Sequence, residues 1–307
     1  MLWPIMLIRN ASRYKGYPAS EEIRALLETL QPWEFRQWVE KISVSRHFQV
    51  NPDSNEQTAY WLAQTLKSWG YDVKFQGRYR NVVATSPGVG KQAVLVGAHY
   101  DSVPMTPGAD DNGSAVAAML GCAKACAQFL PRIPVVFVAF NCEEDGLLGS
   151  SDWVHSFLPA CGYEIISSHI LEMVGYASSE PGSQKIPPGL PIKLPDRGDF
   201  IGLLTNRSGA ALMADSLNGL RTYCPQLPAY GLEVLIGLER FFPVLHRSDH
   251  SPFWKSRIPC VMWTDTSEFR NPHYHGESDL PHTLNYEFLT NVCRALTAVV
   301  LRSATTM

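Results

Sequence analysis

The sequence predicts an α/β fold in which helices cover both faces of a mixed, mostly parallel central sheet, a helix–sheet–helix sandwich. Continuous apolar runs at residues 93–98 and 133–140 are typical of strands that are buried on both faces. Segments with helical periodicity alternate with these runs, which favours layered α/β architecture. Hydrophobic residues make up 45% of the 307 residues and charged residues 18%, so the chain can bury a large core and is not disordered.

The expected elements follow one another in this alternation. Apolar residues at helical spacing predict helices over residues 20–45 and 54–70, and Gly70 ends the second. An alternating strand at 71–75 comes next, and a strand at 81–85 is stopped by a Pro-Gly pair. The remaining predicted elements are strands at 93–98, 133–140, 165–174, 200–205 and 259–263, and helices at 113–130 and 284–301.

We expect one domain over residues 1–307, with an N-terminal helical segment over about residues 1–50. Residues 178–199 interrupt the pattern because they contain five prolines. Predicted core strands lie on both sides of this Pro-rich excursion. It is therefore better interpreted as a surface loop over the edge of the sheet than as a linker between domains.

Charge and cysteine content restrict the partners and the compartment. The formal charge of -3 and the pI near 6.3 provide no basic field, which argues against nucleic acid and membrane surfaces as partners. The apolar residues 1–8 contain Pro4 and lack a basic start, so they do not resemble a signal peptide. Seven cysteines without a CxxC pair indicate reduced thiols and a cytoplasmic protein. No pattern indicates an oligomeric state.

Carboxylates and imidazoles follow the predicted strands at their carboxyl ends, where α/β sheets gather ligands. Acidic groups at this density repel one another unless cations or protons neutralise them. Oxygen and imidazole ligands without thiolates suit zinc, with manganese or cobalt as alternatives. The residues concerned are His99 and Asp101, Asp110 and Asp111, Glu143 and Glu144, Glu172, Asp249 and His250, and His273 and His275.

Each of these features alone has an ordinary explanation. The run from Asp110 to Gly113 is typical of a turn and helix N-cap, and adjacent glutamates at 143–144 are typical of an exposed loop. Glu172 is harder to explain in this way, because burying an unpaired carboxylate within an apolar strand is costly. In His99-x-Asp101, strand geometry puts both side chains on one face, so Asp101 can orient the imidazole. The joint occurrence of all these carboxylates and imidazoles at strand ends predicts a metal site.

Several segments together resemble the co-catalytic zinc aminopeptidases, a peptidase family that also contains glutamate carboxypeptidase-like enzymes and glutaminyl cyclases. The resemblance covers roughly residues 55–305, and the segments occur in the order that the family shows. The matching segments are His99-Tyr100-Asp101-Ser102, Pro107 to Ser114, Asn141 to Ser150, Ser248 to Trp254, and Tyr274-His275.

The resemblance implies two zinc ions as cofactors. His99 would bind one ion and His275 the other, with Asp110 bridging them. Glu144 would join the ion of His275, and Glu172 stands where the family usually has an aspartate as the remaining ligand. The resemblance also implies a strained backbone at Asp110-Asp111, for which a non-proline cis peptide bond is one form.

The resemblance further assigns the catalytic groups. Glu143 would be the general base and later acid, and Asp101 would be the partner that orients His99. Many of the family's aminopeptidases carry a tyrosine just before the Ser-Asp-His motif to hold the oxyanion. Residues 243–247 contain no tyrosine here, so His246 or Arg247 would take that place.

The leading hypothesis is a metallo-aminopeptidase that hydrolyses N-terminal residues of peptide substrates through metal-bound hydroxide and Glu143. A glutaminyl cyclase that forms N-terminal pyroglutamate is the alternative, but cyclases lack the second acidic residue that Asp111 supplies. A metal-free binding module is a third hypothesis, although all the ligand positions hold side chains that can bind metal. A carboxypeptidase specificity also stays open, with Arg270 as the group that would pair with a substrate carboxylate.

Overall fold

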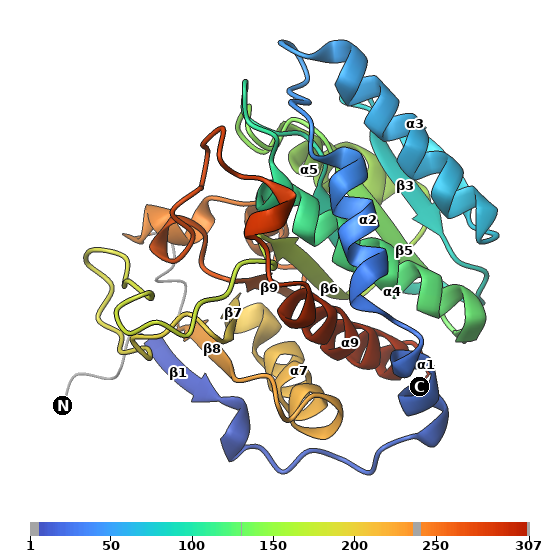
Figure 1. Cartoon of the computed structure of the whole chain (residues 1–307). Helices are drawn as coiled ribbons and strands as arrows, with labels where there is room; N and C mark the ends of the chain where they lie inside the picture. Colours follow the sequence, from blue (N-terminus) through green and yellow to red (C-terminus); the bar gives the residue numbers. More distant parts are fainter. Residues whose placement is uncertain (1–5, 130, 236–240, 306–307) are drawn as a thin grey trace.

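The computed structural model describes residues 6–129, 131–235 and 241–305, and the strands among them form one nine-stranded sheet. Its order is β1-β8-β7-β9-β6-β4-β5-β3-β2 (Figure 1). The strands are β1 Met6–Asn10, β2 Asp72–Gln76, β3 Asn81–Thr85, β4 Gln92–His99, β5 Val135–Phe140, β6 Glu164–Glu172, β7 Ile201–Asn206, β8 Ala229–Val234 and β9 Cys260–Thr264.

The centre of the sheet is parallel and its edges contain antiparallel pairs, which confirms the predicted fold class. Strands β9, β6, β4 and β5 pair in parallel, and so do β7 and β8. The antiparallel pairs are β1 with β8, β7 with β9, β3 with β5 and β2 with β3. β4 ends at His99 and the neighbouring β6 ends at Glu172, so both side chains lie at the same edge of the sheet. This arrangement brings strand-end residues that are distant in sequence to one place.

Alternate strand residues pack into two apolar layers, one on each face. Val94 and Val96 of β4 join the larger layer, whereas Leu95 joins the smaller one. The larger layer is covered by α1 Glu21–Glu28, α2 Pro32–Ile42, α3 Pro52–Ser68, α4 Ala115–Phe129, α7 Ala210–Tyr223 and α9 Tyr286–Ser303. The smaller layer includes residues of the helical turn Trp153–Phe157, of α8 His250–Lys255 and of the Pro-rich excursion (Leu190), and it packs against α6 Leu158–Cys161; α5 Leu148–Asp152 precedes that turn.

The N-terminal segment differs from the prediction of a helical segment over about residues 1–50. Residues 6–10 form strand β1, which pairs antiparallel with β8 (Met6 opposite Val234), and the first α-helix begins only at Glu21. Helix α7 and strand β8 were likewise not expected from the sequence. Residues 6–10 form a strand because they pair with β8, which is distant in sequence. The pattern of apolar residues within so short a segment does not predict such a non-local contact.

The Pro-rich excursion joins two strands of the same sheet, β6 and β7, and an isolated bridge between Ser178 and Gly198 closes its base. All seven cysteines are free thiols, as expected. Within the described ranges, no helix combines the length and the apolar character needed to cross a bilayer.

His169 on β6 is a buried histidine whose protonation should affect the stability of the fold. The side chain is fully buried, and its Nδ1 accepts a hydrogen bond from Trp263 Nε1 at 3.2 Å, which leaves no place for a second proton. Burial lowers the pKa of His169 to about 3. The unfolded chain titrates near 6.5, so below that pH it binds a proton that the native state excludes.

We therefore predict that stability falls as the pH drops from about 6.5 toward 3, with this histidine contributing about 2 kcal/mol of loss by pH 5. Urea unfolding at pH 7 and pH 5 measures the effect. His169→Gln should lose less stability over the same interval than the parent chain. Equal losses in the two proteins would contradict the assignment.

Candidate active site

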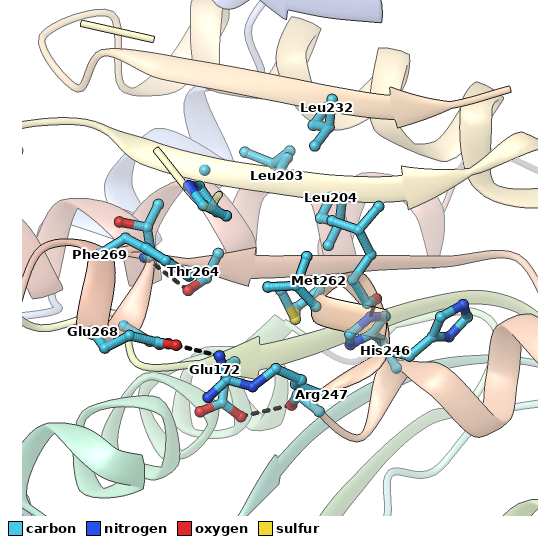
Figure 2. Close-up of a pocket in the computed structure, with 18 of the residues that line it drawn as sticks. Glu172, Leu203, Leu204, Leu232, His246, Arg247, Met262, Thr264, Glu268 and Phe269 are labelled. Carbon is cyan, nitrogen blue, oxygen red and sulfur yellow. Dashed lines mark hydrogen bonds and ion pairs between the residues drawn. The ribbon is translucent and has the colours of Figure 1, made fainter. Parts of the chain in front are cut away.

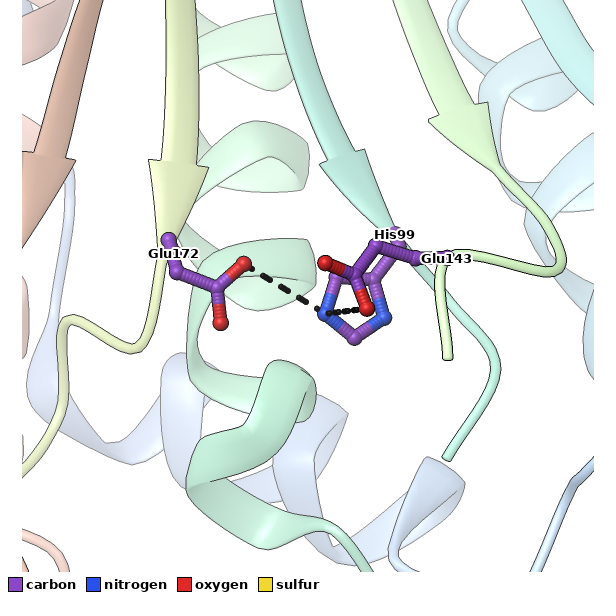
Figure 3. A group of neighbouring side chains, drawn as sticks. All are labelled: His99, Glu143 and Glu172. Carbon is purple, nitrogen blue, oxygen red and sulfur yellow. Dashed lines mark ion pairs between the residues drawn. The ribbon is translucent and has the colours of Figure 1, made fainter. Parts of the chain in front are cut away.

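Three buried groups meet at the carboxyl edge of the sheet (Figure 3). His99 comes from the end of β4, Glu172 from the end of β6, and Glu143 from the loop after β5. His99 Nε2 lies 3.5 Å from Glu172 Oε2 and 3.9 Å from Glu143 Oε2. Since each of the three is 8% exposed or less, their charges interact with little screening by water.

Asp111 joins this group to a second one. Its Oδ1 lies 3.5 Å from His99 Nε2, and its Oδ2 lies 3.1 Å from Nε2 of His275. The same nitrogen of His275 is 3.4 Å from Glu144 Oε2. The two imidazoles are therefore separated by one shared carboxylate, with a further carboxylate beside each.

The structure puts Asp111, not Asp110, at the position that the resemblance assigned to the bridging carboxylate. The carboxylate of Asp110 is turned away and accepts hydrogen bonds from Gly175 N at 3.0 Å and Asn271 Nδ2 at 2.7 Å. The non-proline cis peptide bond follows Asp111, at Asp111–Asn112, one residue later than expected. Consecutive side chains diverge in the turn at Ala109–Ser114, so only one of the two aspartates can face the histidines.

Buried side chains hold the Asp111 turn in place. Asp279 accepts hydrogen bonds from the backbone N–H groups of Asp110 at 2.9 Å and Asp111 at 3.1 Å. Asn112 donates to Leu171 O at 3.0 Å and accepts from Met173 N at 2.9 Å. The turn is thereby fastened to the end of β6, the strand that supplies Glu172.

Arg46, which is fully buried, fastens the same turn to the helical layer. Its Nε donates to Tyr100 O at 2.6 Å, and its Nη2 donates to Gly108 O at 2.9 Å. Gly108 has φ +62°, and a Cβ there would lie 2.3 Å from Asp111 O, so the close turn requires glycine. Arg46 thus adds one buried positive charge close to a strongly acidic site.

Asp101 contacts both His99 and the glutamate loop. Its Oδ1 lies 3.4 Å from His99 Nδ1, and its two oxygens accept from the backbone N–H groups of Glu143 and Glu144 at 3.2 Å each. One buried carboxylate therefore sets the orientation of the imidazole and the position of both glutamates.

The backbone is left-handed beside three of the site residues. Cys142, which precedes Glu143, has φ +56°; Met173, which follows Glu172, has φ +45°; His275 itself has φ +56°. Non-glycine residues rarely adopt this conformation, and where it persists the surroundings impose it. The site is therefore built with the strain that typically accompanies functional geometry.

The charges of the cluster shift one another. Burial opposes ionisation of Asp111, but hydrogen bonds to His275 and His99 outweigh it and lower its pKa below the usual range. Burial and Asp111 together raise the pKa of Glu144 to about 7. Burial lowers the pKa of His275, yet contacts with Asp111 and Glu144 prevail and raise it to about 10. The site thus favours positive charge at its centre.

An apolar cavity of about 460 Å³ opens beside the cluster (Figure 2). Glu172, Glu143 and His275 line one part of it, and Leu204, Leu232 and Met262 on the sheet line another. The volume falls in the range of small-molecule sites, which combine an apolar lining with a few polar groups. A group bound in this cavity would therefore lie directly against the cluster.

The other candidate residues have different surroundings. His250 packs on Trp254 with ring centroids 4.5 Å apart, and its Nε2 lies 2.8 Å from Leu245 O. His246 and Arg247 both line the cavity, where Arg247 donates to Tyr274 OH at 3.0 Å. Arg270 is buried outside the cavity lining and donates to Gln184, so it does not offer its guanidinium to a carboxylate there.

Buried atoms without hydrogen-bond partners show that the donor set fits zinc. Nε2 of His99 and Oε1 of Glu144 are buried, and neither makes a hydrogen bond with any part of the chain that the structure describes. Buried polar atoms are normally satisfied, so these atoms point to a ligand. Imidazole and carboxylate donors arranged around a shared carboxylate suit zinc, and each half provides three protein groups.

Comparisons with known proteins agree with this geometry. Residues 81–190 match the model of peptidase family M28. The chain is 32% identical to the uncharacterized protein YfbL of Escherichia coli over 82% of each chain. It is 25% identical to leucine aminopeptidase 1 of Arthroderma otae, covering 94% of this chain and 79% of the relative. The structure of BSAP, a zinc aminopeptidase from Bacillus subtilis, aligns with a TM-score of 0.56 and 26% identity over 73% of this chain and 50% of that one.

The chain belongs to peptidase family M28. The matched region contains five residues of the cluster: His99, Asp111, Glu143, Glu144 and Glu172. The sixth, His275, lies after it.

Three supporting residues of this M28 peptidase were not expected from the sequence. Asp279 and Arg46 act through hydrogen bonds to distant backbone groups, and neither belongs to a strand-end motif. Ser248 was noticed only as part of the Ser-Asp-His motif, yet its hydroxyl donates to Glu172 Oε2 at 2.6 Å. The adjacent pair Asp110-Asp111 was a usable signal for the bridge, but spacing alone does not tell which member faces inward.

The Asp279 contacts generate a stability prediction. Asp279→Ala would leave two buried N–H groups without an acceptor, so the free energy of unfolding should fall by about 2–5 kcal/mol. Urea denaturation measures the loss. Glu277→Ala, an exposed change two residues away, is the matched control and should have little effect. An Asp279→Ala protein as stable as the control would show that these hydrogen bonds do not hold the turn.

Proposed function

We propose that this protein is a zinc-dependent aminopeptidase that releases N-terminal residues from peptides. The observation that carries the proposal is the carboxylate of Asp111 between His99 and His275, with a second carboxylate beside each imidazole. The zinc aminopeptidase from Bacillus subtilis and the leucine aminopeptidase from Arthroderma otae support the assignment of the activity. Aminopeptidase names among the relatives give no support to the glutaminyl cyclase alternative.

The arrangement supports two ions. His99, Asp111 and Glu172 would hold one, and His275, Asp111 and Glu144 would hold the other. When bound, zinc polarises the scissile carbonyl and lowers the pKa of a water molecule. Asp101 contacts His99 at Nδ1, so Nε2 is the nitrogen that faces Asp111, and the Ser248 hydroxyl donates to Glu172 Oε2, the oxygen that faces His99. Both ligands are therefore held in position by a neighbouring side chain.

Glu143 is the proposed carrier of the proton. Burial and the neighbouring Glu172 raise its pKa well above the ordinary value, although His99 acts in the opposite direction. A carboxylate with a raised pKa accepts a proton from water more readily and can then deliver it to the departing amine. Its backbone N–H is held by Asp101, which fixes where the side chain begins.

We also propose a cytoplasmic location. The seven free cysteines, six of them buried, support it, because thiols persist in a reducing compartment.

If Asp111 bridges the two ions, substitutions at Asp111 and at its neighbour Asp110 should give proteins with different zinc contents. Asp111→Asn should lose at least one of two zinc ions per chain, since its carboxylate faces both histidines. Asp110→Asn should keep both, because that carboxylate is turned away from the histidines and accepts hydrogen bonds from Gly175 and Asn271. Elemental analysis after dialysis from excess zinc gives the counts.

One firmly bound zinc in the parent chain under the same conditions would contradict the paired site. Equal metal loss in both variants would contradict the assignment of Asp111 as the bridge, provided that circular dichroism shows both to be folded.

If Glu143 carries the proton, substitutions at Glu143 and Glu144 should differ in their effects on turnover and on zinc content. Glu143→Gln should retain both metals and lose turnover of an aminoacyl-anilide by about 10²–10⁴-fold. Glu144→Gln should weaken metal binding as well as turnover, since its carboxylate lies 3.4 Å from His275 Nε2.

Turnover and zinc content should be measured on the same preparations. Near-normal turnover by Glu143→Gln, or loss of zinc equal to that of Glu144→Gln, would show that Glu143 is not the proton carrier.

A further inference from the structure

Strand β2 forms a free edge of the sheet. It pairs antiparallel with β3, and no other strand that the structure describes pairs with it. The side chains of Lys74 and Asp72 on this strand are 67% and 66% exposed, so the edge is open to solvent. An edge strand presents a row of unpaired N–H and C=O groups, which can hydrogen-bond with a strand of another chain.

The charges on β2 are self-complementary about Val73. Asp72 and Lys74 flank this residue, and their side chains share one face of the sheet because successive strand residues alternate. When two copies of β2 pair antiparallel with Val73 opposite Val73, each Asp72 lies opposite a Lys74. Registers centred on Asp72 or on Lys74 would put like charges opposite each other, which is destabilising. The order of these three residues therefore favours one register.

The contact that these charges make within one chain does not oppose such pairing. Lys74 Nζ lies 3.0 Å from Asp72 Oδ2. An exposed ion pair of this kind contributes little to stability, so two cross-strand pairs can replace it at small cost. A charge on an edge strand often prevents pairing between copies. Here the acidic and the basic residue, two positions apart, remove that repulsion in the register centred on Val73.

Aromatic surface beside the edge extends the contact. Phe75 of β2 is 39% exposed and Tyr60 of α3 is 48% exposed, with their rings 5.3 Å apart. The Arg80 guanidinium lies 5.4 Å from both ring centroids, which holds the pair in one orientation. In the register centred on Val73, Phe75 lies opposite Tyr71 of the second copy. Five strand residues alone cannot bury the roughly 1,200 Å² of a stable interface, so α3, which packs beside this edge, contributes as well (Figure 1).

We propose that the β2 edge is the interface of a symmetric dimer, in which two copies of this chain join their sheets. The two-fold axis passes between the two Val73 residues, so the same surface of each copy meets the other. Strand β4, which carries His99, is three strands from β2, and the apolar cavity extends in the other direction toward β1. The dimer therefore leaves the acidic cluster and the cavity accessible. The inference does not depend on the proposed function.

Sedimentation velocity tests the proposal. The parent chain should sediment with twice the 34.2 kDa of one copy. Lys74→Asp and Asp72→Lys each put like charges opposite each other twice in the interface, so each should raise the dimer dissociation constant at least about tenfold. Lys91→Asp is the matched control, because Lys91 is exposed, precedes β4 and undergoes the same change of charge away from the edge.

Mixing the two charge-reversed chains gives the decisive result. Lys74→Asp carries two carboxylates on β2 and Asp72→Lys carries two ammonium groups, so an equimolar mixture should form a heterodimer. The chain with both substitutions should again form a dimer with itself. A parent chain with the mass of one copy, a dimer that both reversals leave intact, or a mixture that stays monomeric would overturn the proposal. Equal weakening of the dimer by Lys91→Asp would also overturn it.

Discussion

The site depends on one carboxylate that faces two imidazoles. Asp111 lies within 3.5 Å of both His99 and His275, and all the other acidic side chains of the cluster are arranged around this contact. Negative charge at such density is unfavourable when buried, unless cations are held among the carboxylates. Much of the surrounding structure can be understood as the framework that this charge requires, from the acceptor Asp279 under the turn to the buried Arg46 nearby.

That framework comes from parts of the chain that are far apart in sequence. Arg46, which follows helix α2, donates to a backbone carbonyl of the turn, and Asp279, which precedes helix α9, accepts from its N–H groups. Asn112 connects the turn with β6. Each makes hydrogen bonds with backbone groups, so the positions of the cluster side chains depend on main-chain geometry. A rigid base of this kind is what precise orientation of metal ligands demands.

The sequence predicted the parts of the fold that depend on local pattern. Strands β4 and β5 are continuous apolar runs, and the polar residues at their ends indicated the edge of the sheet where the site lies. Strand β1 was missed because it is defined by its partner β8. The choice between Asp110 and Asp111 was missed for a related reason: it is decided by Asn271, Gly175 and Asp279, which no local pattern connects with the turn.

The register between strands β1 and β8 determines which side chains of β1 line the cavity. Ile8 lies opposite Leu232, and both line the cavity. Successive strand residues face opposite sides, so a slip of one residue between β1 and β8 would present Leu7 or Arg9 in place of Ile8. It would also part Arg9 from Glu233, whose ion pair of 2.6 Å marks the present alignment. The ion pair between Arg9 and Glu233 thereby helps to keep an apolar side chain in the lining of the cavity, although neither residue belongs to the acidic cluster.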